Sequence, residues 1–176
     1  MIYRIGVMIL AFSVGALVLV AATASAGPVA EVVLLDECDP ATFNAVLGPG
    51  ACLNVADVAK VKFLDFIASI PNPSWDNEPN KLTIEKGTTV IATNQGGGVH
   101  TFTEVANFGG GFVPALNQGA PVAPECGGGF STLTVAATRV IQGSHHEVTG
   151  LTEGLHKFQC CIHPWMHTEI QVNESD

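Results

Sequence analysis

The chain has few basic residues: seven Lys and Arg stand against sixteen Asp and Glu, a formal net charge of −9 at pH 7. Nucleic-acid binding relies on clustered Lys and Arg side chains that neutralise phosphates, so this balance excludes nucleic acid as a partner. The carboxylates are scattered without an acid–base pair, and no Ser-His-Asp order is present. The glycine runs lack the strand–glycine–helix context of a phosphate-binding loop. The composition therefore offers no basis for a hydrolase or a nucleotide-binding enzyme.

The first 26 residues have the pattern of a secretory signal peptide. Arg4 gives a positive start, the stretch Ile5–Val20 is almost entirely apolar, and Ala24, Ser25 and Ala26 form a small-x-small cleavage site. A retained anchor is the alternative, because the apolar run approaches the ~20 residues that span a bilayer. We expect cleavage, export to the periplasm or the exterior, and no membrane span afterwards. The remaining 150 residues, with six basic and sixteen acidic side chains and hence a charge of −10, suffice for one domain.

A thiolate, an imidazole and a thioether fall within seven residues near the C-terminus, at Cys160, His163 and Met166. Copper takes this ligand set in electron-transfer sites, whereas hard cations prefer oxygen ligands. His100, far away in the sequence, is the candidate for a second imidazole. Neighbouring strand residues face opposite sides, so only one of Cys160 and Cys161 faces the metal, and the spacing to His163 favours Cys160.

The other four cysteines are candidates for disulfides, which persist in exported proteins. With Cys160 held as a metal thiolate, they allow three pairings. We expect Cys38 to pair with Cys52, closing a short loop worth about 3 kcal/mol. Cys126 would then pair with Cys161.

The rest of the chain divides into an N-terminal arm and a β-rich body. Residues 27–74 form the predicted arm, with a strand at 30–35, a helix at 41–47 that begins after Asp39 and Pro40, and a helical stripe over 55–70. Residues 75–176 form the predicted main domain. Its expected strands cover 81–85, 88–93, 99–105, 130–141, 154–160 and 168–172, with a long ordered loop over 106–129. Short strands at this spacing predict an all-β sandwich or barrel.

The C-terminal motif Cys-x-x-His-Pro-x-Met, with Pro164 after His163, resembles the ligand loop of the cupredoxins, the small blue copper proteins, and most of all that of their amicyanin-like members. Residues 81–90 are similar to the hairpin before the first ligand of that family, and residues 94–103 to the strand that carries it. The resemblance covers about residues 75–173. It implies a cupredoxin-like Greek-key β-sandwich or barrel with a short N-terminal helical arm.

The resemblance also implies one type 1 copper, held by His100, Cys160, His163 and Met166. We expect Asn94 to hydrogen-bond the backbone near the Cys160 loop, although an ordinary turn asparagine is the alternative. Pro164 and Trp165 are expected to form an apolar collar around His163. Weak electron-transfer encounters use small surfaces of that kind, so a redox protein partner is expected to dock near His163 and Trp165.

Together these features predict an exported, monomeric, mononuclear blue copper protein that shuttles single electrons and is not an enzyme by itself. A copper delivery or storage module is one alternative. A methionine-rich or histidine-rich tract would favour it, but the chain has only three methionines, two of them in the signal segment. A small redox enzyme with an open copper position is another, and it requires Met166 to lie away from the metal. A zinc-bound structural domain is the third.

Overall fold

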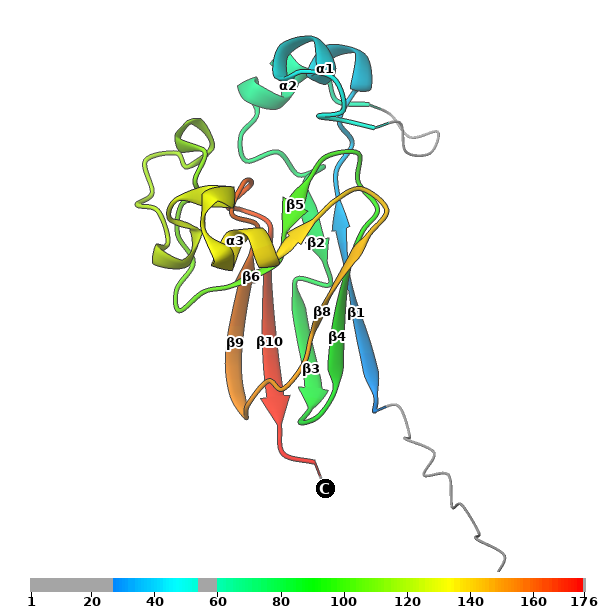
Figure 1. Ribbon diagram of the computed structural model, residues 1–176, viewed down its shortest axis with the longest axis vertical. Helices are drawn as coiled ribbons and strands as arrows, with labels where there is room; N and C mark the ends of the chain where they lie inside the picture. Colours follow the sequence, from blue (N-terminus) through cyan, green and yellow to red (C-terminus); the bar gives the residue numbers. More distant parts are fainter. Residues whose placement is uncertain (1–26, 54–59, 176) are drawn as a thin grey trace, which may run out of the picture.

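The computed structural model describes residues 27–53 and 60–175, which form a β-sandwich with its helices gathered at one end (Figure 1). The predicted signal peptide, and the start of the helical stripe predicted over 55–70, lie outside the described residues. Among the described residues, no helix is both long and apolar enough to cross a bilayer. The all-β class predicted from the sequence is confirmed.

Two four-stranded sheets make up the sandwich, with strand orders β2-β1-β4-β8 and β3-β10-β9-β6, and β5 pairs with β7 beside them. The first sheet contains β1 (Val29–Leu35), β2 (Asp76–Glu78), β4 (Thr89–Asn94) and β8 (His145–Val148). The second contains β3 (Lys81–Glu85), β6 (Thr103–Glu104), β9 (Gly154–Gln159) and β10 (His167–Asn173). The short pair is β5 (His100–Thr101) and β7 (Arg139–Val140). The pairs β1–β4 and β10–β3 are parallel, and β9–β10 is antiparallel.

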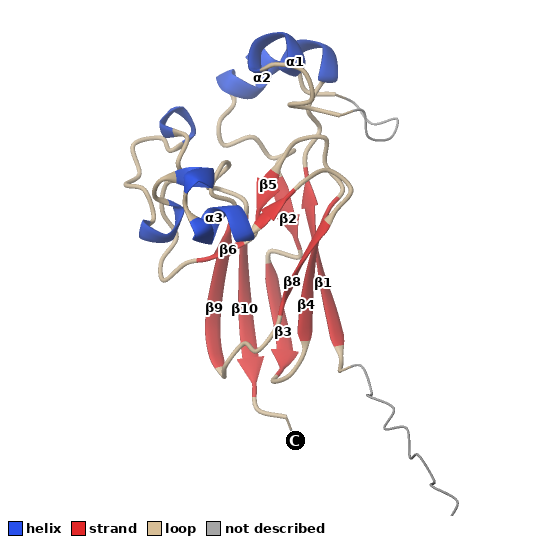
Figure 2. Ribbon diagram, in the orientation of Figure 1, coloured by secondary structure: helices blue, strands red, loops and turns tan. Residues whose placement is uncertain are grey.

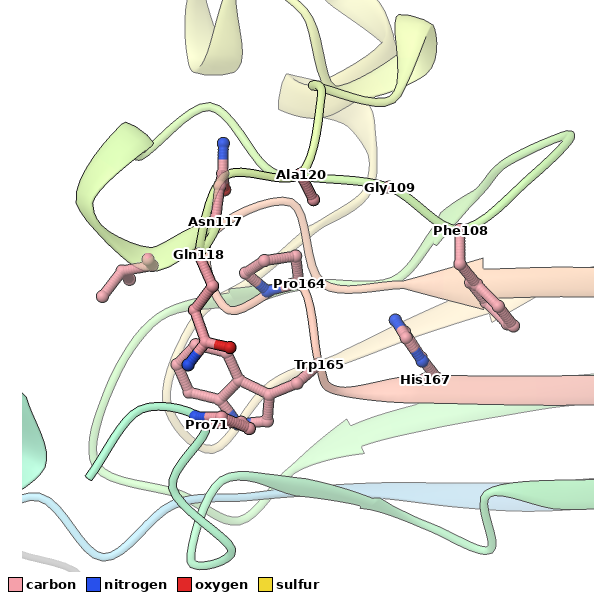
Figure 3. A pocket seen from close by; sticks show the side chains of 10 residues that line it. Pro71, Phe108, Gly109, Asn117, Gln118, Ala120, Pro164, Trp165 and His167 are labelled. Atoms are coloured by element: carbon pink, nitrogen blue, oxygen red, sulfur yellow. The ribbon is translucent and has the colours of Figure 1, made fainter.

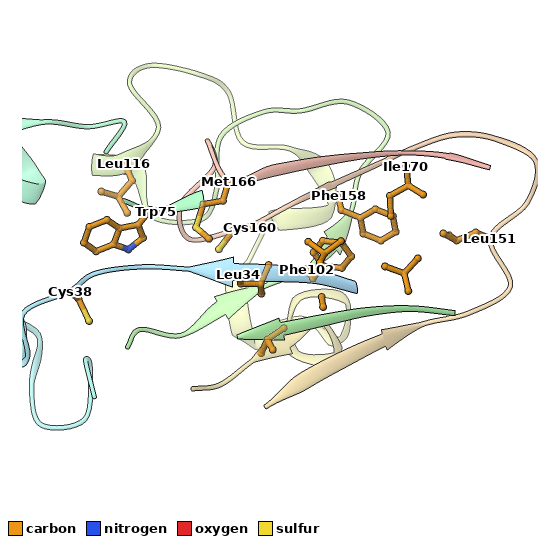
Figure 4. Close-up of a cluster of buried hydrophobic side chains, with 14 of the residues drawn as sticks. Leu34, Cys38, Trp75, Phe102, Leu116, Leu151, Phe158, Cys160, Met166 and Ile170 are labelled. Carbon is orange, nitrogen blue, oxygen red and sulfur yellow. The ribbon is translucent and has the colours of Figure 1, made fainter. Parts of the chain in front are cut away.

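The hydrophobic core lies between the two sheets (Figure 4). Alternating residues of β1 face inward, so Val32 and Leu34 are fully buried while their neighbours are partly exposed. Phe102 and Phe158 stack in the core with their ring centroids 4.5 Å apart. The core continues to Met166 at the end of the sandwich where the β9–β10 connection lies.

The helices of the N-terminal arm lie at this same end (Figure 2). They are α1 (Pro40–Leu47) and α2 (Phe63–Ala68). The side chain of Asp39 accepts a hydrogen bond from the amide of Thr42, which caps α1 as the sequence predicts. Phe43 stacks on Trp75 at a centroid distance of 5.8 Å, and Phe66 packs on the same indole at 4.4 Å. Aromatic packing therefore fixes the helices to the sandwich.

The strand predicted over 130–141 is wrong for most of its length. The chain instead forms a 3-10 turn (Gly129–Ser131), the helix α3 (Leu133–Ala137) and only then β7. Gly128 and Gly129 have positive φ angles, which turn the chain where an extended strand would have to begin. One helical turn then directs Val135 into a small core with Cys126, so tertiary packing outweighs the β-branched composition.

Two strands have no counterpart in the sequence prediction, namely β2 and β8. Both lie at the edges of the first sheet, where short polar sequences carry no apolar alternation. The strand of the predicted arm, β1, lies between β2 and β4, so the arm contributes to the sandwich. The boundary between residues 74 and 75 stays a prediction.

Candidate metal centre

Three buried side chains converge at the helical end of the sandwich: His100, Cys160 and His163. His100 begins β5, Cys160 follows β9, and His163 lies in the turn before β10. One potential ligand atom from each lies within 4.8 Å of the other two. The Cys160 Sγ is 3.7 Å from Nδ1 of His100 and 3.8 Å from Nδ1 of His163.

These separations fit a metal ion placed between the three atoms. Metal–nitrogen bonds of about 2.0 Å and metal–sulfur bonds of about 2.3 Å at a trigonal angle put nitrogen and sulfur about 3.7 Å apart. Cys160 is the free cysteine of the described residues, because the other four form disulfides. The donor set is thus one thiolate and two imidazoles, all shielded from solvent.

Met166 adds a thioether at the same place. Its side chain is fully buried, and Figure 4 shows it pointing toward Cys160. The connection between β9 and β10 is closed by two backbone hydrogen bonds, from Cys160 N to the Met166 carbonyl and from Met166 N to the His163 carbonyl, both 3.0 Å. The tight loop predicted from the spacing of the motif is therefore present.

Thr101, next to His100 on β5, forms hydrogen bonds with both Cys160 and Cys161. Its amide donates to the Cys160 sulfur at 3.4 Å, and its hydroxyl accepts from the Cys161 amide at 2.8 Å. A backbone amide directed at sulfur favours the thiolate over the thiol. The sequence analysis did not identify this residue.

The electrostatics of the site favour a thiolate. Burial raises the pKa of the Cys160 thiol, but hydrogen bonds and charges from His100 and His163 outweigh burial and hold that pKa well below its usual value. Burial lowers the pKa of His100, whereas its hydrogen bonds to Asp36 and Cys160 raise it to about 9. Metal binding would then displace a proton from the imidazole.

Asp36 is a second residue beside the proposed ligands that the sequence did not indicate. Its Oδ2 lies 2.8 Å from Nε2 of His100, and both side chains are fully buried. The carboxylate pairing leaves Nδ1 of His100 facing the sulfur. An acidic residue directly after the apolar strand β1, combined with three glycines shortly before His100, is the sequence signal that could have identified it.

Asn94 supports the glycine turn that precedes His100 and not the Cys160 loop that we expect it to bond. Its amide nitrogen donates to the carbonyls of Gly98 and Val140 at 2.9 and 3.0 Å, and its Oδ1 accepts from the Gly96 amide at 2.9 Å. The reason is its position at the last residue of β4, directly before the turn. Asn94 thus acts on the His100 side of the site.

The ring of His163 lies beneath aromatic side chains and is only 9% exposed. Its centroid is 6.1 Å from Phe66, 6.2 Å from Trp75 and 5.7 Å from Trp165. The Trp165 indole is fixed by hydrogen bonds from Nε1 to the carbonyls of Asn72 and Trp75. Pro164 and Trp165 line a surface pocket beside the loop (Figure 3).

Two disulfides flank the site, with the pairing expected from the sequence. Cys38 and Cys52 have Cα atoms 6.2 Å apart, and Cys126 and Cys161 have Cα atoms 5.2 Å apart. The second bond attaches the loop that carries Cys126 to the residue next to Cys160.

Comparison with known proteins gives structural likeness only. No protein-family model matches the chain, and no curated protein matches it. Among solved structures, a purple cupredoxin from Nitrosopumilus maritimus has 18% identity and a TM-score of 0.43, covering 82% of this chain and 99% of that one. The oxidised plastocyanin from Dryopteris crassirhizoma has 18% identity and a TM-score of 0.40, with 82% and 100% covered. A reduced amicyanin variant has 20% identity and a TM-score of 0.35, with 55% and 71% covered.

The fold agrees with the family that the sequence resembles. The two-sheet sandwich, the loop with Cys160 and His163 between its last two strands, and His100 on a separate strand correspond to a cupredoxin-like fold.

Proposed function

We propose that this protein is an exported, monomeric type 1 copper protein that carries single electrons between redox partners. The observation that supports the proposal most is the buried convergence of the Cys160 sulfur with Nδ1 of His100 and Nδ1 of His163. Met166 would add a weakly bound thioether. Copper bound there would supply a one-electron couple, and the protein would contribute the ligands and the enclosure.

Hydrogen bonds within the protein hold the proposed ligand side chains in position. The Cys160 loop is closed by backbone hydrogen bonds, and Thr101 donates to the sulfur. The His100 ring is fixed by the hydrogen bond between its Nε2 and Asp36. Ligands that are held this way meet both oxidation states in nearly the same positions, and a small rearrangement favours fast electron transfer.

Retention of copper through a redox cycle separates an electron carrier from a delivery module. We expect voltammetry of the copper-loaded protein to give a reversible one-electron wave. We expect no copper to pass to a Cu(I) chelator when ascorbate reduces the protein. Release of copper to the chelator on reduction would favour delivery or storage over electron transfer.

The other two alternatives have less support from the site. An enzyme with an open copper position requires Met166 to lie away from the metal, yet its side chain is buried beside Cys160. A structural zinc site uses thiolates and imidazoles as well, so direct competition between the two metals is the test. Copper binds such sites more tightly than zinc, and we expect it to displace zinc from this one.

The partner is proposed to be a redox protein that docks near His163 and Trp165. Pro164 and Trp165 lie at the edge of a pocket of about 280 Å³ that is lined mainly by apolar groups, including Pro71 and Leu116. The negative net charge would steer the chain toward basic partners. Because Phe66 and Trp75 pack over His163, the partner would approach the Trp165 side of the loop.

A further inference from the structure

We propose that Asp36 is a positioning residue of the copper site, which orients His100 and lowers the reduction potential of the bound metal. This inference rests on the proposed function and goes beyond it, because it assigns a fifth residue, from the N-terminal arm, to the site. Asp36 touches none of the other proposed ligands in the hydrogen bonds described, and it acts through His100.

Asp36 fixes the orientation of the His100 imidazole. The Asp36 carboxylate, 2.8 Å from Nε2, accepts a hydrogen bond from the N–H of that nitrogen. The tautomer with Nε2–H leaves the lone pair on Nδ1, which is the nitrogen 3.7 Å from the Cys160 sulfur. Partners of this kind fix the ring and raise the basicity of the metal-binding nitrogen.

The negative charge of Asp36 would also act on the bound copper. Both side chains are fully buried, so the negative charge of Asp36 is weakly screened by solvent. A fixed anion next to a ligand stabilises the more positively charged Cu(II) over Cu(I). Removal of that charge is therefore expected to raise the reduction potential.

Backbone amides from two loops surround the Asp36 carboxylate and donate hydrogen bonds to it. Oδ1 accepts from the amides of Cys38 and Gly97 at 3.2 and 3.1 Å, and Oδ2 accepts from the Gly98 amide at 2.8 Å. A Cβ at Gly96 would lie 2.1 Å from Asp36 Oδ2, and one at Gly98 would lie 3.2 Å from the same atom. The three glycines before His100 therefore bring backbone amides close enough to hold the carboxylate.

The same contacts give the N-terminal arm a role at the site. Asp36 follows β1 directly and precedes Cys38, whose disulfide closes the arm onto itself. A Cβ at Gly97 would lie 2.7 Å from the Cys38 sulfur, so the glycine turn packs on both the carboxylate and the disulfide. The arm thus contributes a side chain to the metal centre as well as a strand to the sheet.

The test is the reduction potential of the copper-loaded Asp36→Asn variant against a control, Glu37→Gln. Both substitutions remove one negative charge, but Glu37 accepts from Ser74 and does not contact His100 in the hydrogen bonds described. We expect Asp36→Asn to reduce the preference for Cu(II) over Cu(I) at least tenfold, which is about 59 mV for a one-electron couple. The control is expected to shift the potential by less than a third of that.

A second measurement covers the case in which Asp36→Asn fails to fold, since its amide nitrogen cannot accept from Cys38 and Gly97. In the unaltered Cu(I) protein, nitrogen-15 NMR of the His100 ring is expected to show a slowly exchanging proton on Nε2. A ring without a proton on Nε2 would overturn the inference. An unchanged potential in a blue Asp36→Asn variant would overturn it too, while leaving the proposed function intact. Absence of the blue band in the unaltered protein would instead contradict the proposed function.

Discussion

Asp36 and His100 are 64 positions apart in the sequence, yet Oδ2 of the first lies 2.8 Å from Nε2 of the second, with both side chains fully buried. The pair joins the end of β1 to the start of β5, and so links the N-terminal arm to the metal centre. Three backbone amides donate further hydrogen bonds to the carboxylate. These hydrogen bonds offset the cost of taking the carboxylate out of water, which a buried charge without partners would not recover.

The Asp36 carboxyl should make the metal-free protein sensitive to acid. Burial raises the pKa of Asp36, but hydrogen bonds from His100 and the backbone outweigh burial and lower it from 3.8 to about 2. The unfolded chain therefore takes up this proton first, and the stabilisation is present above about pH 4 and lost as the pH falls toward 2. The shift corresponds to about 2 kcal/mol. Chemical denaturation at pH 6 and pH 2 should show the destabilisation by Asp36→Asn shrinking by about that amount, and an equal effect at both pH values would contradict it.

Gly96→Ala is expected to damage the His100 side of the site. The added Cβ would lie 2.1 Å from Asp36 Oδ2 and 2.7 Å from the Asp36 backbone nitrogen, so the turn or the carboxylate must move. Overpacking of this kind costs about 1–3 kcal/mol, and we expect weaker copper binding as well. Gly127→Ala is the matched control, because its Cβ would meet only the Pro124 carbonyl, at 3.2 Å. Equal stability loss in the two variants, measured by denaturant unfolding, would argue against the crowding at Asp36.

Met166→Leu separates the thioether from its packing. The two side chains are similar in volume, so the metal-free protein should lose less than about 1.5 kcal/mol of stability. If Met166 is a weak ligand, its loss should raise the reduction potential of the copper form and keep the thiolate charge-transfer band. Voltammetry and the visible spectrum check both expectations. An unchanged potential would mean that the sulfur of Met166 does not reach the metal.

The Cys38–Cys52 disulfide should stabilise the arm that supplies Asp36. The two cysteines are 14 positions apart in the sequence, and for a loop of that length the chain-entropy model gives a stabilisation of about 3 kcal/mol. The double variant Cys38→Ser/Cys52→Ser is expected to lose about that amount in denaturant unfolding. Because the Gly97 turn packs on this bond, the variant should also bind copper less tightly than the unaltered protein. Loss of stability with unchanged copper affinity would show that the arm and the site are independent.

The sequence predicted the features that depend on local pattern. The spacing of Cys160, His163 and Met166 gave the loop, and Asp39 with Pro40 gave the start of α1. It did not predict Asp36, because its partner is set by the parallel pairing of β1 with β4, a long-range relationship. The helix α3 was missed for a similar reason, since the burial of Val135 against Cys126 outweighs the strand preference of its neighbours.

The visible and EPR spectra of the protein from residue 27 onward, loaded with Cu(II), test the central claim most directly. We predict an intense charge-transfer band with narrow copper hyperfine splitting, lost in Cys160→Ala. The band should persist in Cys126→Ser/Cys161→Ser, which removes the neighbouring disulfide without leaving a free thiol. A colourless protein with ordinary broad splitting would contradict the account and leave a metal-binding module or a zinc domain in its place.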